Sequence, residues 1–312
     1  MDALDLQQIA LRARRRLLRM HFESRIGHLG GNLSALDAML CLHHAVMKPA
    51  DNFILSKGHA AGALYITLWS LGLLAEEDLA TFHADGTLLA GHPVPGWSAH
   101  IPIATGSLGH GFPVALGMAL ARQLNGEAGH VYCLTSDGEW QEGAMWEALI
   151  FWAHRKLTNL TVLVDLNGLQ GFGSTREVAS MHDLGRRIEG FGIPVAHLDG
   201  HDHRAIAAAA RAHPGAMLIL HTVKGKGVSF MEGRMEWHYL PMSEQQYAEA
   251  LRGLEFMAPG GKIRVDAKNQ HTWKRLRIGR VNKQRQLDLV DESKELVAPE
   301  PYAAPLHNRR GT

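Results

Sequence analysis

Four short apolar runs constrain the fold of this chain most strongly: Val131–Ser136, Leu160–Asp165, Ile193–Leu198 and Met217–Thr222. None alternates cleanly between apolar and polar residues, which is typical of strands buried on both faces of a sheet. Helical periodicity recurs in other segments, namely Leu6–Arg25, Leu33–Met47, Ala60–Leu71, His110–Leu124, Met145–Arg155 and Arg204–Ala212. Because strands and helices alternate along much of the chain, we predict an α/β fold with a doubly wound parallel sheet.

The chain is long enough to enclose such a sheet without disulfides. It has 312 residues, of which 46% are hydrophobic, a composition typical of globular proteins. No apolar stretch approaches the ~20 residues of a membrane-spanning helix, and no secretory signal pattern is present. The Arg-rich segment Leu11–Arg25 fits a first helix better than a presequence. Cys41 and Cys133 lie in apolar runs, which favours buried thiols in a reducing compartment, the cytoplasm.

Polar residues follow two consecutive predicted strands. Asp137-Gly138 comes directly after Val131–Ser136, and Asn167-Gly168 comes just after Leu160–Asp165. The carboxyl ends of parallel strands meet at one edge of the sheet, where ligands bind. Carboxylate and amide oxygens at this edge suit a hard cation such as Mg²⁺ or Ca²⁺. Taken singly, Asp and Asn beside glycine are also ordinary turn residues.

These residues resemble the thiamine diphosphate fingerprint, in which Gly-Asp-Gly is followed one strand later by Asn, although Ser136 replaces the first glycine. Seven segments share the order and spacing of the transketolase family and narrow the resemblance to it. They are Gly27-His28-Leu29-Gly30-Gly31, Ser56-Lys57-Gly58-His59-Ala60, Gly91-His92-Pro93, Thr105-Gly106-Ser107-Leu108-Gly109, Asp137-Gly138-Glu139-Trp140-Gln141-Glu142-Gly143, Thr222-Val223-Lys224-Gly225-Lys226-Gly227 and Glu236-Trp237-His238. The resemblance covers Leu6 to Leu254.

The resemblance implies a metal and a cofactor. The side chains of Asp137 and Asn167 and the backbone carbonyl of Leu169 would hold Mg²⁺, or Ca²⁺, on the diphosphate of thiamine diphosphate. Asn167 would also contact the cofactor, and the amide of Gly138 would meet a phosphate oxygen. These residues make up the predicted diphosphate site.

Other family positions lie outside the diphosphate site. By the resemblance, the carbonyl of Gly106 would receive the aminopyrimidine ring, and Leu108 would also bind the cofactor. Glu142 would join a carboxylate network across a subunit interface, or it is a first-turn carboxylate favoured by the helix dipole. Lys224 and Lys226 either approach the active site or are solvated.

The chain contains 20 histidines, most of which we expect to be structural. His28, His59 and His92 each adjoin glycine, where the backbone can approach a ligand closely. Imidazoles bind hydroxyl groups and transfer protons near neutral pH. By the resemblance, His28 and His92 would contact the sugar donor, and His59 would lie between diphosphate and substrate. His238 would contact the diphosphate and assist proton transfer. His110, where the family commonly has Gln, is either a substrate adaptation or a helix-start residue.

Half of a transketolase site has no counterpart in the predicted elements. In the family, a second, pyrimidine-binding domain supplies the glutamate that activates the aminopyrimidine and the arginines that bind the sugar phosphate. After Leu254 no further run of strands and helices is predicted. The resemblance therefore implies the N-terminal subunit of a split transketolase, which pairs with a pyrimidine-binding partner chain in a heterotetramer. The assembly would transfer a two-carbon ketol unit from a ketose, or its phosphate, to an aldose, with the cofactor performing the carbon chemistry.

The last part of the chain differs in charge. Residues 258–312 carry 12 Lys and Arg against 6 Asp and Glu. We therefore divide the chain into a thiamine diphosphate-binding domain, residues 1–257, and a basic C-terminal extension, residues 258–312. The segment Lys262–Arg285, with Trp273, could bind nucleic acid. Its low apolar content favours a disordered or partner-wrapping extension instead, and the resemblance does not reach it.

Other functions remain open from the sequence. The chain could belong to a 2-oxoacid dehydrogenase or a deoxyxylulose-phosphate-synthase-like enzyme, but Ser56–Ala60 and Glu236–His238 favour transketolase. It could also be a non-catalytic paralogue, although such a protein has no need for the complete set of metal-binding and histidine residues. Donor and acceptor sugars, and whether the pathway is central or specialised, are not predicted, because the residues that read the far end of the sugar would lie on the partner.

Overall fold

The computed structural model describes residues 3–252, 255–258, 261–265, 272–273, 277–281 and 287–292. The chain divides into two compact units, residues 1–247 and 248–312. The division predicted from charge, between residues 257 and 258, stays a prediction.

The first unit is built on a five-stranded sheet in which every strand pair is parallel, in the order β1-β2-β3-β7-β6. Its strands are β1 Asn52–Leu55, β2 Val131–Ser136, β3 Leu160–Leu166, β6 Val195–Asp199 and β7 Met217–His221. All residues of β2 are buried, as are all but the last of β3. The predicted parallel α/β sheet is therefore confirmed. β6, at an edge of the sheet, is not buried on both faces as its apolar run predicted, and β1 is the strand that the sequence analysis missed.

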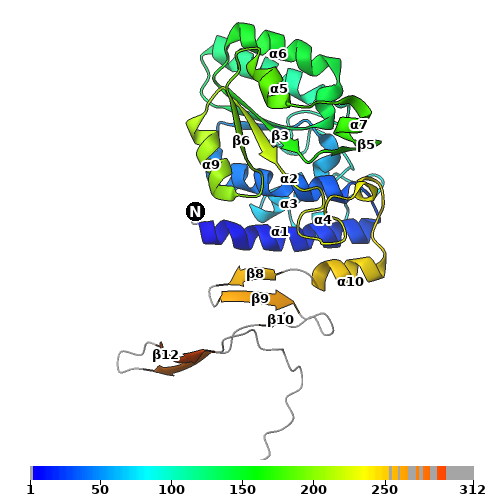
Figure 1. The fold of residues 1–312 in the computed structure, drawn as a ribbon, viewed down its shortest axis with the longest axis vertical. Coiled ribbons are helices and arrows are strands. Elements are labelled where there is room, and N and C mark those ends of the chain that lie inside the picture. The colour runs from blue at the N-terminus through cyan, green and yellow to red at the C-terminus, as the bar shows by residue number, and fades with distance from the viewer. Residues whose placement is uncertain are drawn as a thin grey trace, which may run out of the picture. The chain divides into compact units, whose positions relative to one another are not determined.

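Helices cover both faces of this sheet (Figure 1). On one side lie α5 Gly111–Asn125 and α6 Gly143–Arg155, and on the other lie α1 Ala3–Ser24, α2 Leu29–Cys41 and α3 Ala61–Ser70. A π-helical turn, Leu42–Val46, continues α2. The remaining helices are α4 Glu76–Leu79, α7 Thr175–Ala179, α8 Leu184–Glu189, α9 His203–Ala212 and α10 Glu244–Arg252. The doubly wound arrangement is thus confirmed.

Local sequence explains where several helices begin and end. The carboxylate of Asp202 accepts hydrogen bonds from the backbone amides of Arg204 and Ala205, which caps the start of α9. At the other end of a helix, Gly126 adopts a left-handed conformation (φ 68°) and closes α5. Between α5, α6 and the sheet, the rings of Phe112, Trp140 and Trp152 are fully buried and lie in contact. These rings belong to the apolar core that packs α5 and α6 against the sheet.

Short elements follow the strands at their carboxyl ends. A two-residue hairpin, β4 Leu169–Gln170 with β5 Gly173–Ser174, comes directly after β3. The 3₁₀ helix Gly138–Gln141 follows β2, and two others span Gly58–Ala60 and Met235–His238. These elements form the edge of the sheet at which the sequence predicts a ligand site.

The second unit contains short antiparallel strands. Strands β8 Glu255–Ala258, β9 Gly261–Val265 and β10 Thr272–Trp273 form one sheet. Strands β11 Arg277–Val281 and β12 Leu287–Glu292 form a hairpin. The sequence analysis predicted no second run of strands and helices after Leu254, but it did not foresee these short strands, because polar segments joined by turns form hairpins without a strong apolar pattern. No described helix alternates with these strands, so they do not form a second α/β sheet.

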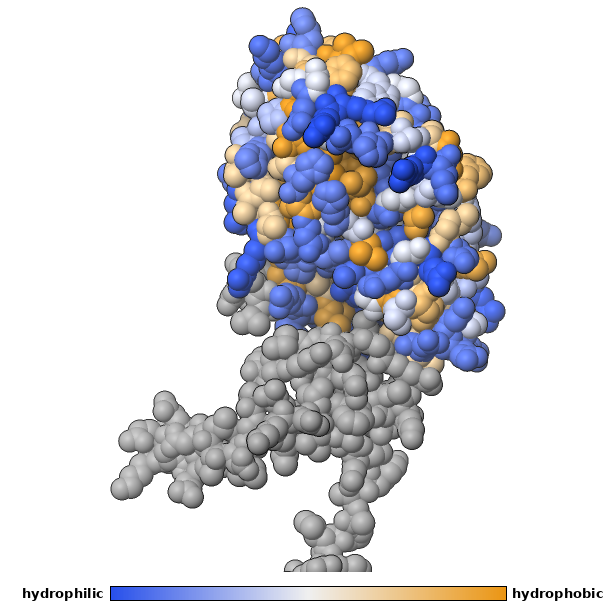
Figure 2. All heavy atoms as spheres, viewed as in Figure 1, coloured by the Kyte–Doolittle hydropathy of each residue, from blue (hydrophilic) through white to orange (hydrophobic). Residues whose placement is uncertain are grey.

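The surface of the first unit mixes polar and apolar side chains, as Figure 2 shows for one face. Single exposed apolar residues are normal on folded proteins. The most exposed large one among the described residues is Phe172, with 84% of its surface accessible, in the β4–β5 turn. In the part of the chain that the structure describes, no helix has the length and apolar content needed to cross a bilayer.

Candidate thiamine diphosphate site

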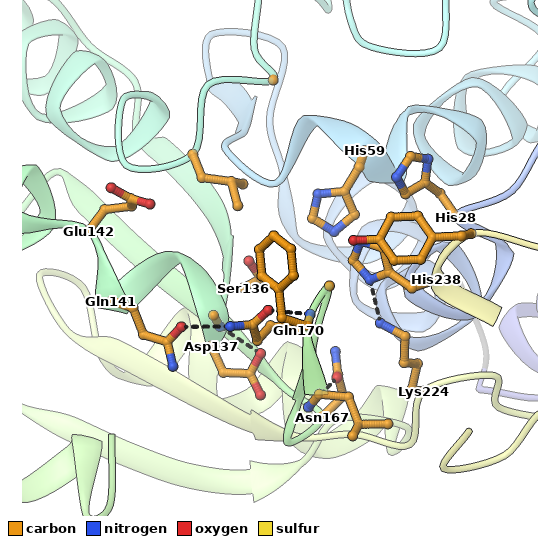
Figure 3. Close-up of a pocket in the computed structure, with 18 of the residues that line it drawn as sticks. His28, His59, Ser136, Asp137, Gln141, Glu142, Asn167, Gln170, Lys224 and His238 are labelled. Carbon is orange, nitrogen blue, oxygen red and sulfur yellow. Dashed lines mark hydrogen bonds between the residues drawn. The ribbon is translucent and has the colours of Figure 1, made fainter. Parts of the chain in front are cut away.

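A pocket of about 350 Å³ lies at the carboxyl edge of the sheet (Figure 3). Its volume is within the usual range for sites that bind small molecules and cofactors. All the predicted site residues line it: His28, His59, His92, Gly106, Leu108, Asp137, Gly138, Glu142, Asn167, Leu169 and His238. The fold thus brings residues from distant segments into one site, and their individual roles stay predictions.

The predicted metal ligands meet because β2 and β3 pair in register, with Ser136 opposite Asp165. Asp137 Oδ1 accepts a hydrogen bond from the Gly138 amide (2.8 Å), and Oδ2 accepts one from the Gly168 amide (2.5 Å). The Gly138 amide, which the resemblance assigns to a phosphate oxygen, is therefore bonded to Asp137 in this structure. A carboxylate accepts about four hydrogen bonds or ligands, so Asp137 retains capacity for a cation.

The amide of Asn167 is also oriented by its neighbours. Its Nδ2 donates to Asp165 Oδ1 (3.4 Å), and its Oδ1 accepts from the Leu169 amide (3.1 Å). This places the amide oxygen beside Leu169, whose carbonyl is the third predicted ligand.

This donor set fits a hard cation. It consists of oxygen atoms from a carboxylate, an amide and a carbonyl, as Mg²⁺ prefers. Burial, and next the nearby charge of Asp165, raise the pKa of Asp137 to about 6, and no described basic side chain forms an ion pair with it. A divalent cation would supply the missing positive charge. Within the described residues no group of three or more His, Cys, Asp or Glu side chains could hold a metal, so a cation at Asp137 would also need the amide and carbonyl oxygens.

Four histidine rings gather on the opposite wall of the pocket. The ring centroid of His28 lies 5.7 Å from that of His59, 6.2 Å from that of His92 and 5.2 Å from that of His238. His28 has a left-handed backbone conformation (φ 62°), and its backbone amide donates a hydrogen bond to the carbonyl of His238 (2.9 Å). Two segments far apart in sequence are therefore joined at this wall.

These histidines are neutral near pH 7. Burial lowers the pKa of His28 to about 4 and that of His238 to about 3, with smaller contributions from positive neighbours such as Lys224. Burial likewise lowers the pKa of His59 and of His92. Neutral imidazoles can accept protons from hydroxyl groups or bond to them.

Lys224 is a site residue that the sequence analysis left undecided. It is 2% exposed, lines the pocket, and places its Nζ 3.0 Å from His238 Nδ1 (Figure 3). Burial, followed by repulsion from Lys57, lowers the pKa of Lys224 to about 8. Because the ammonium group can only donate, His238 accepts at Nδ1 and carries its proton on Nε2. By contrast, Lys226 is partly exposed, with its Nζ 3.9 Å from Glu232.

Comparison with known proteins identifies the family. The family described as "Transketolase, thiamine diphosphate binding domain" matches residues 21–304 of this chain. The chain belongs to the transketolase family. This match extends to residue 304, so the expectation that the family resemblance ends at Leu254 was wrong, and the second unit lies largely within the family's domain.

Two transketolase relatives are themselves single subunits of larger enzymes. One, from the apulose-4-phosphate transketolase of Phocaeicola vulgatus, is 37% identical over 80% of this chain and 93% of the relative. The other, from the 6-deoxy-6-sulfo-D-fructose transketolase of a Clostridium species, is 35% identical over 81% of this chain and 97% of the relative. The predicted likeness to the N-terminal subunit of a split transketolase is therefore confirmed.

Solved transketolase structures share the fold. The transketolase from Campylobacter jejuni superposes with a TM-score of 0.73 at 27% identity, over 80% of this chain and 42% of that one. The enzyme from Leishmania mexicana gives a TM-score of 0.73 at 26% identity, over 80% of this chain and 41% of that one. The chain spans about two fifths of the length of these transketolases.

Two further predicted positions of the transketolase site differ in placement. Glu142 lines the pocket and precedes α6, but its side chain makes no cap hydrogen bond. His110 does not line the pocket; it precedes α5, and its Nδ1 lies 3.1 Å from the Leu108 carbonyl. This position favours the helix-start interpretation of His110.

Asn32 holds two of the histidine segments and was not predicted from the sequence. Its fully buried amide donates to the carbonyls of His28 (2.8 Å) and His59 (3.0 Å) and accepts from the Ala63 amide (2.7 Å). No motif points to it, because its partners are backbone groups.

We expect Asn32→Ala to lower the free energy of unfolding by about 2–3 kcal/mol, because buried backbone groups of His28, His59 and Ala63 lose their partner. Urea denaturation followed by circular dichroism measures the change. Asn125→Ala is the matched control, since Asn125 is exposed and bonds only Glu127 among the described side chains. Equal stability of the two variants would contradict the role of Asn32.

Proposed function

We propose that this chain is the diphosphate-binding subunit of a thiamine diphosphate-dependent transketolase. With a separate pyrimidine-binding chain, it transfers a two-carbon ketol unit from a ketose, or its phosphate, to an aldose acceptor. The observation that carries the proposal is the single pocket that combines the oxygen donors of Asp137, Asn167 and Leu169 with four histidines. A binding protein without catalysis has no use for both sets of residues.

The residues divide the work between two walls of the pocket. We assign Asp137, Asn167 and Leu169 to a divalent cation, proposed to be Mg²⁺, that neutralises the cofactor's diphosphate. When bound, thiamine diphosphate supplies the carbanion chemistry that breaks and forms the ketose carbon–carbon bond. Gly106 and Leu108 would receive its ring.

The histidine wall would handle the sugar. His28 and His92 would bind hydroxyl groups of the donor, and their neutral imidazoles can accept protons from them. His59 would separate the diphosphate from the substrate. His238, which Lys224 holds as the Nε2-H tautomer, would donate its Nε2 proton to the cofactor or substrate and regain a proton at Nε2 after the transfer.

A partner chain would complete the site. Among the described residues that line the pocket, none is an arginine and the only glutamate is Glu142. A sugar phosphate needs basic groups for recognition, and we propose that the partner supplies them, together with the activating glutamate. Two such pairs would form a heterotetramer.

The sugar substrate is not assigned. The relatives from Phocaeicola vulgatus and Clostridium are named for different sugars and share similar identity with this chain. Specificity would therefore be decided at the partner's side of the pocket. The two cysteines, both buried and unpaired, support our proposal of a reducing compartment such as the cytoplasm.

Reconstitution tests the proposed function. We expect no ketol transfer from the isolated chain and clear activity when the chain is mixed with a pyrimidine-binding transketolase subunit, Mg²⁺ and thiamine diphosphate. A coupled assay with ketose donors and, in parallel, 2-oxoacid donors measures the reaction. Turnover by the isolated chain would refute dependence on a partner, and preference for a 2-oxoacid would refute the transketolase reaction.

A further inference from the structure

The Glu139 carboxylate is a buried acid that the proposed function does not use. Glu139 is 0% exposed and lies in the 3₁₀ helix Gly138–Gln141, which directly follows Asp137. It does not line the pocket, so it does not touch a ligand there. No described basic side chain forms an ion pair with it. Burying a carboxylate without a positive partner costs free energy. The hydrogen bonds that Glu139 accepts must therefore offset this cost.

Three segments donate to this carboxylate. Oε1 accepts from Ser56 Oγ (2.5 Å) and from the Gly109 amide (2.9 Å), and Oε2 accepts from the Ser136 amide (3.3 Å). Ser56 follows β1, Ser136 ends β2, and Gly109 ends the loop that precedes α5. One side chain therefore joins three segments that form walls of the pocket.

The loop Gly106–Gly109 is tightly enclosed. A Cβ atom at Gly58 would lie 2.7 Å from the Gly106 nitrogen, and one at Gly109 would lie 2.8 Å from Glu142 Cβ. Gly106 (φ 144°) and Gly109 (φ 84°) also adopt backbone conformations that side chains disfavour. Among the described hydrogen bonds, the one from Gly109 to Glu139 ties this loop to the strand end that carries Asp137.

We infer that Glu139 is a positioning residue that fixes the Gly106–Gly109 loop relative to Asp137. It thereby sets the spacing between the part of the pocket that takes the cofactor's ring and the part that takes its diphosphate. A carboxylate is suited to this position because it only accepts hydrogen bonds. The inference rests on the proposed cofactor and goes beyond it by assigning a residue that never contacts the cofactor.

Two ligands that both carry a diphosphate group, only one of which has the cofactor's ring, can distinguish a positioning role of Glu139 from a general structural role. Calorimetry on the reconstituted complex compares thiamine diphosphate with inorganic pyrophosphate, each with saturating Mg²⁺. We expect Glu139→Ala to weaken thiamine diphosphate binding about tenfold or more, the equivalent of one or two hydrogen bonds. The affinity for pyrophosphate should stay within about twofold of the wild-type value, because Glu139→Ala leaves the predicted metal ligands Asp137, Asn167 and Leu169 unchanged. Glu177→Ala, which removes an exposed carboxylate bonded to Ser174, is the control and should bind both ligands as the wild type does.

A second variant keeps the inference testable if the first does not fold. Glu139→Gln retains the size of the side chain and one acceptor for Gly109, and should weaken only thiamine diphosphate, by less than Glu139→Ala does. Equal losses for both ligands, or no loss for either, would overturn the positioning role. Failure of the wild-type complex to bind thiamine diphosphate at all would instead overturn the proposed function and the inference with it.

Discussion

Asp137→Asn should lower Mg²⁺-dependent thiamine diphosphate affinity by on the order of 100-fold or more, since even residues that only support a metal ligand contribute 10–100-fold. Asp137 is the only charged group among the three predicted ligands, so the variant leaves the cation with neutral oxygens from Asn167 and Leu169. Asparagine keeps the size of the side chain and one acceptor for the backbone amides that Asp137 binds. Calorimetry on the reconstituted complex, with and without Mg²⁺, measures the effect.

The control for this variant removes a comparable charge outside the pocket. Asp183 is an exposed carboxylate whose Oδ2 lies 3.4 Å from Arg186 Nε, and Asp183→Asn should bind the cofactor as the wild type does. Unchanged Mg²⁺ dependence in Asp137→Asn would show that the cation is held elsewhere, and the assignment of the metal ligands would then be wrong.

Buried apolar runs made the sheet predictable from the sequence. β2 occupies the predicted residues Val131–Ser136, and β3 extends Leu160–Asp165 by one residue. Such strands are predictable because both faces are buried, so apolar composition alone distinguishes them. β1 was missed because Asn52–Leu55 is only four residues long and lies between two helical segments.

The pocket was predictable to the extent that its residues adjoin glycine or follow a strand. Asp137 and Asn167 follow β2 and β3, and His28, His59 and His92 adjoin glycine. The convergence of Asp137 and Asn167 follows from the parallel register of β2 and β3.

The residues that hold this pocket together were not predictable. These are Asn32, Glu139 and the pair Lys57–Asp165. Asn32 and Glu139 bond to backbone groups of other segments, and Lys57 and Asp165 pair with each other. Burial of a polar side chain depends on tertiary packing, which neither periodicity nor a single motif reveals. Lys57 and Glu139 lie within recognisable motifs, yet only the structure shows that they are absent from the pocket's lining.

The second prediction with a large effect concerns the buried pair Lys57–Asp165. Both side chains are 1% exposed, and Lys57 Nζ contacts Asp165 Oδ2 and the Gly31 carbonyl. We expect Lys57→Met to lower the free energy of unfolding by about 3–5 kcal/mol, because it leaves the Asp165 carboxylate buried without a positive partner. Urea denaturation followed by circular dichroism measures this loss, and Lys48→Met, at an exposed lysine, should leave stability nearly unchanged.

A double variant distinguishes charge imbalance from lost packing. In Lys57→Met with Asp165→Asn the unpaired charge is removed, and the hydroxyls of Ser34 and Thr222, which donate to Asp165 in the wild type, can rotate to accept from the new amide. The double variant should therefore be more stable than Lys57→Met alone, since an unpaired buried charge costs more than a neutral pair. If the losses in the free energy of unfolding from the two replacements instead added independently, Lys57 and Asp165 would not be coupled. The contribution of this pair to stability would then come from packing rather than from charge balance.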